Sequence, residues 1–139
     1  MIKVIQITDL NDLLKYWPKL LALVKKESPQ VVAEHFLQLL LTCYDNGAVF
    51  VVRNFGQFCG MCCVQAQPDY TLVLRGIPND KGTGAAKACI EAVKSWGQEH
   101  EYETLEVSSE RLNGSAFRYF EKSLGFRRKF VTFVLPINK

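Results

Sequence analysis

The chain has 139 residues, a length that fits one domain, and its 48% apolar and 22% charged residues are ordinary for a globular protein. This composition excludes a collagen-like repeat, a coiled coil and wholesale disorder, and no run approaches the ~18 consecutive apolar residues of a membrane span. The net charge of +3, from 17 basic and 14 acidic residues, argues against nucleic-acid binding, which usually needs a stronger and more clustered excess.

The amino-terminal part of the chain is predicted to form one strand followed by two helices. Apolar and polar residues alternate over residues 3–7, which is typical of a short strand. Asp9 then offers an N-cap, as does the threonine before it, for a helix with leucines at helical spacing. Pro18 must kink or restart this helix because proline has no N–H to donate. A second helix is predicted over about residues 29–44.

The middle of the chain is predicted to form an antiparallel meander followed by a parallel unit. Residues 48–53, 58–67 and 70–75 are β-rich and are separated by turn sequences. A glycine-bearing loop over residues 76–84 then leads into an amphipathic helix, and a further strand is predicted at 103–108. A strand, a helix and a second strand in this order require a parallel pair joined by a right-handed crossover.

The last predicted elements are a helix over residues 113–124 and a strand over residues 129–137. No linker, repeat or low-complexity segment interrupts the chain, so we expect a single domain over residues 1–139. The predicted fold class is α/β, with a central mixed sheet that is mostly antiparallel, one parallel βαβ unit, and helices on both faces.

Five cysteines occur in a chain whose first residues show no secretory signal. We therefore expect reduced thiols in a cytoplasmic protein, mostly acting as small buried residues. Cys59, Cys62 and Cys63 are close in sequence, but no second pair of cysteines or histidines follows to complete a closed zinc site. No metal site is predicted.

The most informative segment is Asn79-Asp80-Lys81-Gly82-Thr83-Gly84, between a predicted strand and a predicted helix. Its glycines allow a tight turn and a close approach to a ligand. The first N–H groups of the helix are unpaired and favour phosphate, although an ordinary loop remains open as an interpretation. A nucleotide-hydrolase P-loop needs a lysine directly after the second glycine, and this segment has none there. A dinucleotide-binding fingerprint needs a glycine where Lys87 stands, so the segment matches neither motif.

This loop resembles the pyrophosphate loop of the GNAT superfamily of N-acetyltransferases, which reads [QR]-x-x-G-x-[GA], with Asn79 where the family prefers Gln or Arg. A second match begins at Asn113 and ends at Gly125-Phe126, against a family pattern of roughly N-x-x-A-x-x-x-Y-x-x-x-G-F. The order of predicted strands and helices is also similar. The resemblance covers residues 48–135 well and residues 1–47 by topology alone, and it implies a GNAT-like fold.

The resemblance implies acetyl-CoA as co-substrate. Its pyrophosphate would lie on the N–H groups of the glycine loop, and its pantetheine arm would pair with the end of the fourth strand as an added strand. The cofactor-binding residues implied in this way are Leu72, Leu74, Gly76, Asn79, Asp80, Lys81, Gly82, Thr83, Gly84, Ala85, Asn113 and Phe120.

The implied reaction is direct attack of a primary amine on the thioester carbonyl, with the oxyanion stabilised by a backbone N–H near Leu74. A general base deprotonates the ammonium and a general acid protonates the thiolate. The family's tyrosine acid corresponds to Phe120 here, so Tyr119, one residue earlier, is the candidate acid. The fourth strand carries no carboxylate, so Glu106 on the next strand is the candidate base, acting through water. Weaker candidates for the base are Asp69, Glu34 and His35.

Three functional hypotheses remain open at this point. The first is an N-acetyltransferase that acts on a primary amine of a small molecule, a protein lysine or an amino terminus. The second is a catalytically impaired GNAT-like domain that binds acyl-CoA or a protein partner as a regulatory module, and the third is an interaction protein with a structural loop. The missing tyrosine and strand carboxylate favour the second, whereas the glycines and Asn113 favour retained cofactor binding. Homodimers are common in the resembling family, and no membrane partner is expected.

Overall fold

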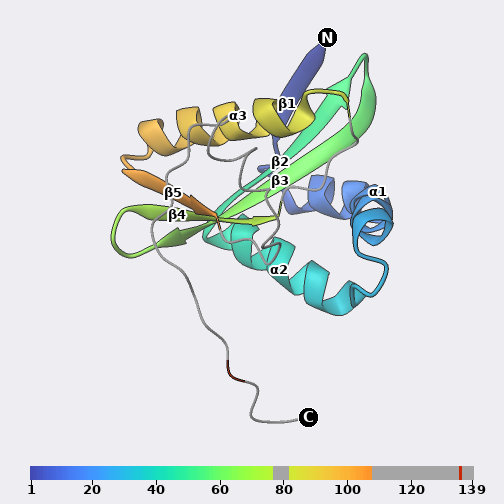
Figure 1. The fold of residues 1–139 in the computed structure, drawn as a ribbon, viewed down its shortest axis with the longest axis horizontal. Helices are drawn as coiled ribbons and strands as arrows, with labels where there is room; N and C mark the ends of the chain where they lie inside the picture. The colour runs from blue at the N-terminus through green and yellow to red at the C-terminus, as the bar shows by residue number, and fades with distance from the viewer. Residues whose placement is uncertain (77–81, 108–134, 136–139) are drawn as a thin grey trace. The chain divides into compact units, whose positions relative to one another are not determined.

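The computed structural model describes residues 1–76, 82–107 and 135, and residues Met1–Ser108 form one compact unit, to which the following account applies. The elements predicted at 113–124 and 129–137 lie outside the described residues. The described elements, shown in Figure 1, are β1 (Ile2–Gln6), α1 (Leu10–Glu27), α2 (Ala33–Asp45), β2 (Gly47–Asn54), β3 (Gln57–Gln67), β4 (Thr71–Gly76), α3 (Ala85–Glu99) and β5 (Thr104–Val107).

The described strands form one five-stranded sheet in the order β1-β2-β3-β4-β5. The three pairs from β1 to β4 are antiparallel, and β4 pairs with β5 in parallel. The helix α3 makes the crossover between β4 and β5. The predicted meander, the parallel βαβ unit and the mostly antiparallel mixed sheet are therefore confirmed.

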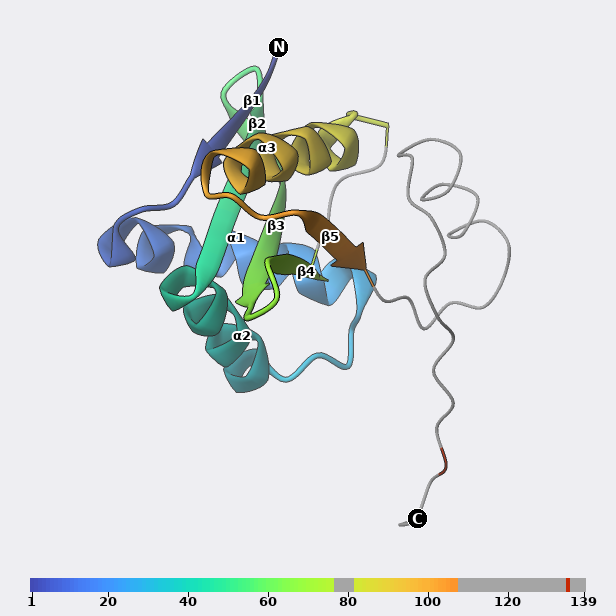
Figure 2. The ribbon, with the colours of Figure 1, turned by 90° about the vertical axis from the view of Figure 1, so that its left-hand side faces the viewer.

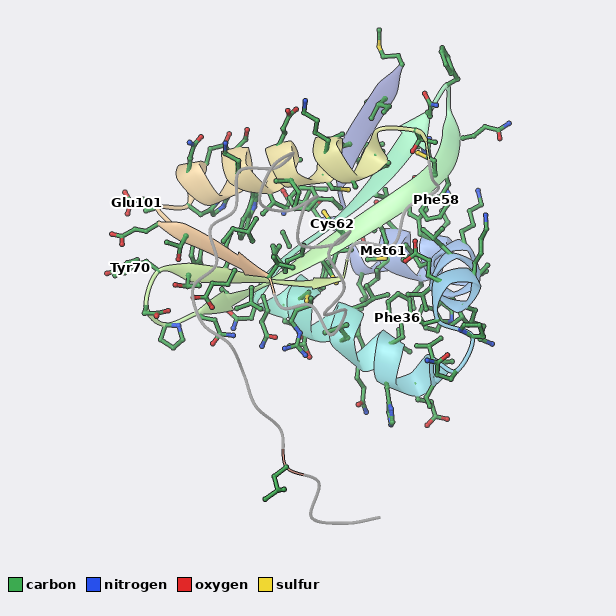
Figure 3. All side chains as sticks on the ribbon, viewed as in Figure 1. Phe36, Phe58, Met61, Cys62, Tyr70 and Glu101 are labelled. Carbon is green, nitrogen blue, oxygen red and sulfur yellow. The ribbon has the colours of Figure 1, made fainter. Side chains whose placement is uncertain are left out.

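The helices lie on both faces of this sheet, as predicted. In Figures 1 and 2, α3 lies on one face, and α2 lies on the other. The side chains of β3 alternate between the two faces because successive residues of a strand point in opposite directions. Figure 3 shows this alternation, with Met61 on the side of α1 and α2 and Cys62 on the side of α3.

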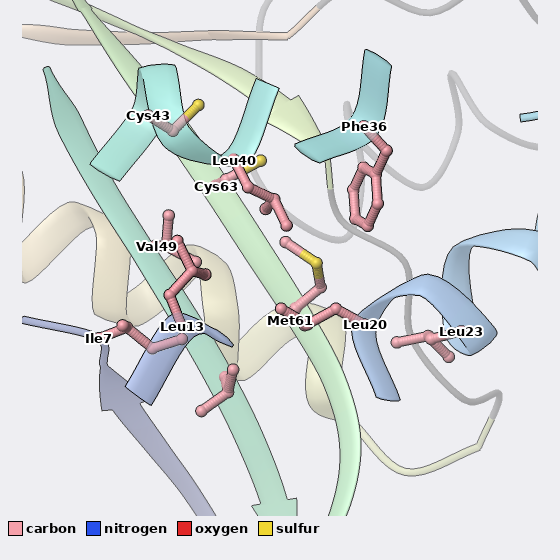
Figure 4. Packing of buried hydrophobic residues seen from close by; sticks show 11 residues of the cluster. Ile7, Leu13, Leu20, Leu23, Phe36, Leu40, Cys43, Val49, Met61 and Cys63 are labelled. Carbon is pink, nitrogen blue, oxygen red and sulfur yellow. The ribbon is translucent and has the colours of Figure 1, made fainter. Parts of the chain in front are cut away.

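The main hydrophobic core lies between the sheet and the pair α1 and α2. Leu13 and Leu20 of α1, Leu40 of α2, and Val49 and Met61 of the sheet are each 0% exposed (Figure 4). Burial of one such side chain stabilises the fold by about 1.5–3 kcal/mol. All five cysteines are free and buried, which confirms their expected role as small buried residues.

The helix α1 begins at its predicted N-cap and is not interrupted at Pro18. The carboxylate of Asp9 accepts a hydrogen bond from the Asn11 N–H at 2.9 Å, so Asp9 is the N-cap. The helix continues through Pro18, and the predicted alternative of a restarted helix is wrong. Proline removes one backbone hydrogen bond. Buried side chains on both sides of it, Leu13 and Leu20, hold the apolar face of α1 on the core.

The start of β2 depends on a close backbone approach at Gly47. A Cβ added to Gly47 would lie 2.0 Å from the carbonyl oxygen of Val64 on β3. Real Cβ atoms do not come so near to an oxygen, so any side chain at this position must push β2 away from β3.

We predict that Gly47→Ala lowers the free energy of unfolding by about 3 kcal/mol, because the backbone of a buried strand pair must move. The matched control is Gly56→Ala, in which the backbone also has a positive φ of +79° but the new Cβ meets nothing within 4 Å. The control should cost only about 1 kcal/mol. Urea denaturation measures both losses, and equal losses would show that the contact with Val64 is not limiting.

Candidate active site

The end of β4 extends beyond the described part of β5. The parallel register runs from Thr71 opposite Thr104 to Leu74 opposite Val107. β4 continues to Gly76, whereas the described strand β5 ends at Val107. Up to Leu74, β4 is therefore enclosed by β3 on one side and by β5 on the other.

A β-bulge lies at this same end of β4. On β3, Cys63 is opposite Gly76 and the next residue, Val64, is opposite Leu74, so Arg75 is an extra residue without a partner in the register. A bulge bends its strand, interrupts the ladder of hydrogen bonds and turns a side chain to a new direction. The backbone around Arg75 is consequently the described part of β4 best placed to meet a ligand.

The side chain of Arg75 lies on the α2 face of the sheet. Its positive charge acts on two thiols there, Cys43 of α2 and Cys63 of β3. The hydrogen bond with Cys63 and, to a smaller extent, the charge of Arg75 lower the pKa of Cys43. These two thiols also hydrogen-bond to each other, and this bond together with burial raises the pKa of Cys63 well above its usual range. Cys63 is therefore a neutral thiol rather than a nucleophile.

A second pair of thiols occupies the opposite face. Cys62 of β3 hydrogen-bonds with Cys89 of α3, and this bond followed by burial raises the pKa of Cys62 well above its usual range. Cys62 is for this reason also neutral. Within the described residues, no group of three or more metal-binding side chains gathers.

The candidate base Glu106 shares the α2 face with Arg75. Glu106 is opposite Val73 in the parallel register, and paired residues of neighbouring strands point to the same face. Two positions back along the same face, the hydroxyl oxygens of Thr71 and Thr104 are 3.0 Å apart and hydrogen-bonded. Glu106 is half-buried.

The start of α3 has the backbone conformation that the glycine motif predicted. Gly82 has φ +78° and the N-cap Gly84 has φ +77°, values that favour glycine. The N-cap residue Gly84 provides no side-chain cap, and the first turn of the helix carries no acidic residue. α1, in contrast, is capped by the Asp9 carboxylate.

The free donors at this helix start can be specified. The Ala85 N–H donates to the Thr83 hydroxyl at 3.3 Å, and the Ala88 N–H donates to the Gly84 carbonyl at 3.2 Å. The N–H groups of Ala86 and Lys87 come before that first bond of the helical ladder and have no partner within the helix. With the positive end of the helix dipole, they favour an anion at this point.

Among the predicted cofactor-binding residues of β4, Leu72 and Leu74 differ from Gly76 in their neighbouring strands. The side chains of Leu72 and Leu74 are buried, and the backbone of both lies between β3 and β5. A Cβ built on Gly97 of α3 would lie 3.2 Å from the Leu72 side chain, which shows that Leu72 packs against α3. Neighbouring strands thus occupy both edges of β4 at Leu72, whereas Arg75 has no partner in the described registers.

The sequence analysis did not select Arg75 as a candidate site residue. Its position depends on a bulge that forms when β3 pairs with β4, and no sequence motif predicts that bulge. Of the predicted site residues, those that lie outside the described part of the chain are Asn79, Asp80, Lys81, Asn113, Tyr119 and Phe120.

The larger hollow found among the described residues lies elsewhere. It has a volume of about 580 Å³ and lies between α1 and the turn from β2 to β3, with Lys19, Lys26 and Phe58 in its lining. It contains none of the predicted site residues. No helix in the described part of the chain is both long enough and apolar enough to span a membrane.

Comparison with known proteins points to one family. The model of the acetyltransferase (GNAT) family matches residues 16–126 of this chain. A search of the curated proteins found no match.

The fold is similar to several solved structures. The aminoglycoside N-acetyltransferase AAC(6')-Iy in complex with CoA superposes with a TM-score of 0.77 at 20% identity, covering 99% of this chain and 96% of that one. The same enzyme bound to the bisubstrate analog CoA-S-monomethyl-acetylneamine gives 0.77 at 20% identity, covering 98% of both chains. A ribosomal-protein-alanine N-acetyltransferase from Brucella melitensis biovar Abortus 2308 gives 0.74 at 16% identity, covering 99% of this chain and 100% of that one.

Proposed function

The chain belongs to the acetyltransferase (GNAT) family, and we propose that it transfers the acetyl group of acetyl-CoA to a primary amine by direct attack on the thioester. The observation that carries this proposal is the start of α3, where two glycines in the left-handed conformation precede a helix whose N-cap residue provides no side-chain cap and whose first turn carries no acidic residue. Such a helix start suits the pyrophosphate of the co-substrate.

The pyrophosphate would be held by donors of the first turn of α3. Ala86 and Lys87 supply N–H groups without intrahelical partners, and the exposed Lys87 adds a positive charge. Gly84 allows close approach because a ligand meets no Cβ there. The neighbour AAC(6')-Iy was solved with CoA, which supports the same co-substrate here.

The thioester would lie at the end of β4. We place the pantetheine arm, as an added strand, at Arg75 and Gly76, which follow the last β4 residue that pairs with the described part of β5. The bulge there interrupts the ladder, so a backbone N–H near Leu74 is available to the oxyanion that develops on the thioester carbonyl.

Glu106 is the proposed base. It lies on the α2 face, beside the β4 end at which we place the thioester. From there its carboxylate accepts a proton from the ammonium through water, which yields the neutral amine that attacks. Tyr119 remains the proposed acid, on the resemblance of its helix to the family pattern.

The acceptor is proposed to carry a primary amine. One neighbour is named as acting on aminoglycosides and another on the alanine of a ribosomal protein, so similar folds serve both small and polypeptide acceptors. The free, buried cysteines fit a reducing compartment and support a cytoplasmic location.

The direct test is release of the CoA thiol from acetyl-CoA when the purified chain is given small amines and peptides. Acceleration by at least one amine supports the proposal. Tight binding of acetyl-CoA without any acceleration would instead support the regulatory-module hypothesis, which the comparisons do not favour. Absence of acetyl-CoA binding in calorimetric titration would contradict both.

We predict that Gly84→Glu raises the Kd for acetyl-CoA about 100-fold, because its carboxylate would occupy the anion site at the start of α3. The matched control Gly84→Ala carries the same backbone strain at φ +77° without the charge, and it should change the Kd less than about tenfold. Isothermal titration measures both values, and circular dichroism checks the fold. Equal affinities of the Glu variant and the unmodified chain would show that the pyrophosphate binds elsewhere.

We predict that Glu106→Gln lowers kcat about 100-fold, because the amide keeps the shape of the side chain but cannot accept the proton. The KM for acetyl-CoA should stay unchanged, since Glu106 lies on the face opposite α3. Steady-state kinetics with the best amine measures both constants. An unchanged kcat would rule Glu106 out as the base.

A further inference from the structure

We infer that Arg75 binds a carboxylate on the acceptor, so that the enzyme selects amines with a carboxylate near the amino group, such as free amino acids, over polycationic amines. This inference rests on the proposed function and specifies its acceptor. It also separates the chain from its structural neighbours that act on aminoglycosides, because those acceptors are positively charged.

The backbone gives the first support. Arg75 is the extra residue of the β4 bulge, one position after the last residue of β4 that pairs with β5. It thus occupies the point of the sheet at which the thioester is proposed to lie. Bulges next to active sites commonly turn one side chain toward the ligand, and here the side chain turned in this way is a guanidinium.

The surroundings of the guanidinium give the second support. Arg75 is exposed, and the described groups on which its charge acts are the thiols of Cys43 and Cys63. Cys63 is buried and neutral, so it does not balance the charge. The arginine is therefore available to an anion from outside the described chain.

The position of Glu106 gives the third support. Glu106 and Arg75 lie on the same face, on neighbouring parallel strands. An amine that gives its proton to Glu106 must enter on this face, where any second group that it carries comes under the charge of Arg75. A carboxylate matches the planar fork of the guanidinium with two parallel hydrogen bonds. A second ammonium would be repelled.

The experiment compares matched pairs of acceptors with the full chain and acetyl-CoA. Each pair consists of an amino acid and the amine left when its carboxylate is removed, for example leucine with isoamylamine, and phosphoethanolamine serves as the probe for a phosphate. Arg75→Gln should lower kcat/KM for the amino acid at least about tenfold and leave that for the bare amine within about twofold. For each acceptor, the variant is compared with the unmodified enzyme. The difference in basicity between the two amines therefore does not affect the comparison.

Two variants complete the design. Arg75→Lys keeps the charge but not the fork and should recover part of the lost kcat/KM for amino acids. Lys25→Gln removes an exposed positive charge at the end of α1 and should leave kcat/KM unchanged for both the amino acid and the bare amine. The thermal transition of each variant checks that the fold is kept.

Other outcomes overturn the inference. Equal losses for both members of a pair would show that Arg75 does not recognise the carboxylate, and a raised KM for acetyl-CoA alone would place it in the co-substrate site. A preference for phosphoethanolamine over every amino acid would make the recognised anion a phosphate. Failure to acetylate any amine would contradict the proposed function itself, whereas acetylation without dependence on Arg75 would contradict this inference alone.

Discussion

The end of β4 is the constraint on which the rest of the site depends. β4 continues past the last residue pair described between β4 and β5, and its register with β3 shifts by one inserted residue, Arg75. An interior strand has both edges occupied by neighbours, so it offers no backbone groups to a ligand. At the bulge the ladder between β3 and β4 is interrupted, and it is there that we propose a strand-like ligand to meet the backbone of β4. The same bulge turns the guanidinium toward the α2 face.

The sheet then divides the chemistry between its two faces. α3 lies on one face and presents its start, which suits the pyrophosphate of the co-substrate. Glu106, the proposed base, and Arg75 lie on the other face, so the sheet separates them from the start of α3. The buried thiols Cys62 and Cys63 point to opposite faces, and a hydrogen bond to a second thiol together with burial raises the pKa of each.

Local signals in the sequence predicted the elements and the glycine turn, because alternation, capping and positive φ are properties of short segments. Asp9 and Gly84 are examples in which the residue type alone fixes the local backbone. Features that depend on pairing between distant segments could not be predicted. The sequence does not show that β5 pairs with β4 at Leu72, so Leu72 was expected to pair with a ligand although β5 occupies its edge. For the same reason, Arg75 was interpreted only as the last residue of a predicted strand.

The most direct test of this account is the change in backbone amide shifts of the 15N-labelled chain during titration with CoA. The glycine amides offer well-separated reporters: Gly76 at the end of β4, Gly82 and Gly84 before α3, and Gly56 in the remote turn between β2 and β3. The account predicts that the first three shift together with a common Kd while Gly56 stays in place. Saturable binding that leaves Gly76 and Gly84 unmoved, or that shifts the amides of Lys19 and Lys26 instead, would contradict it.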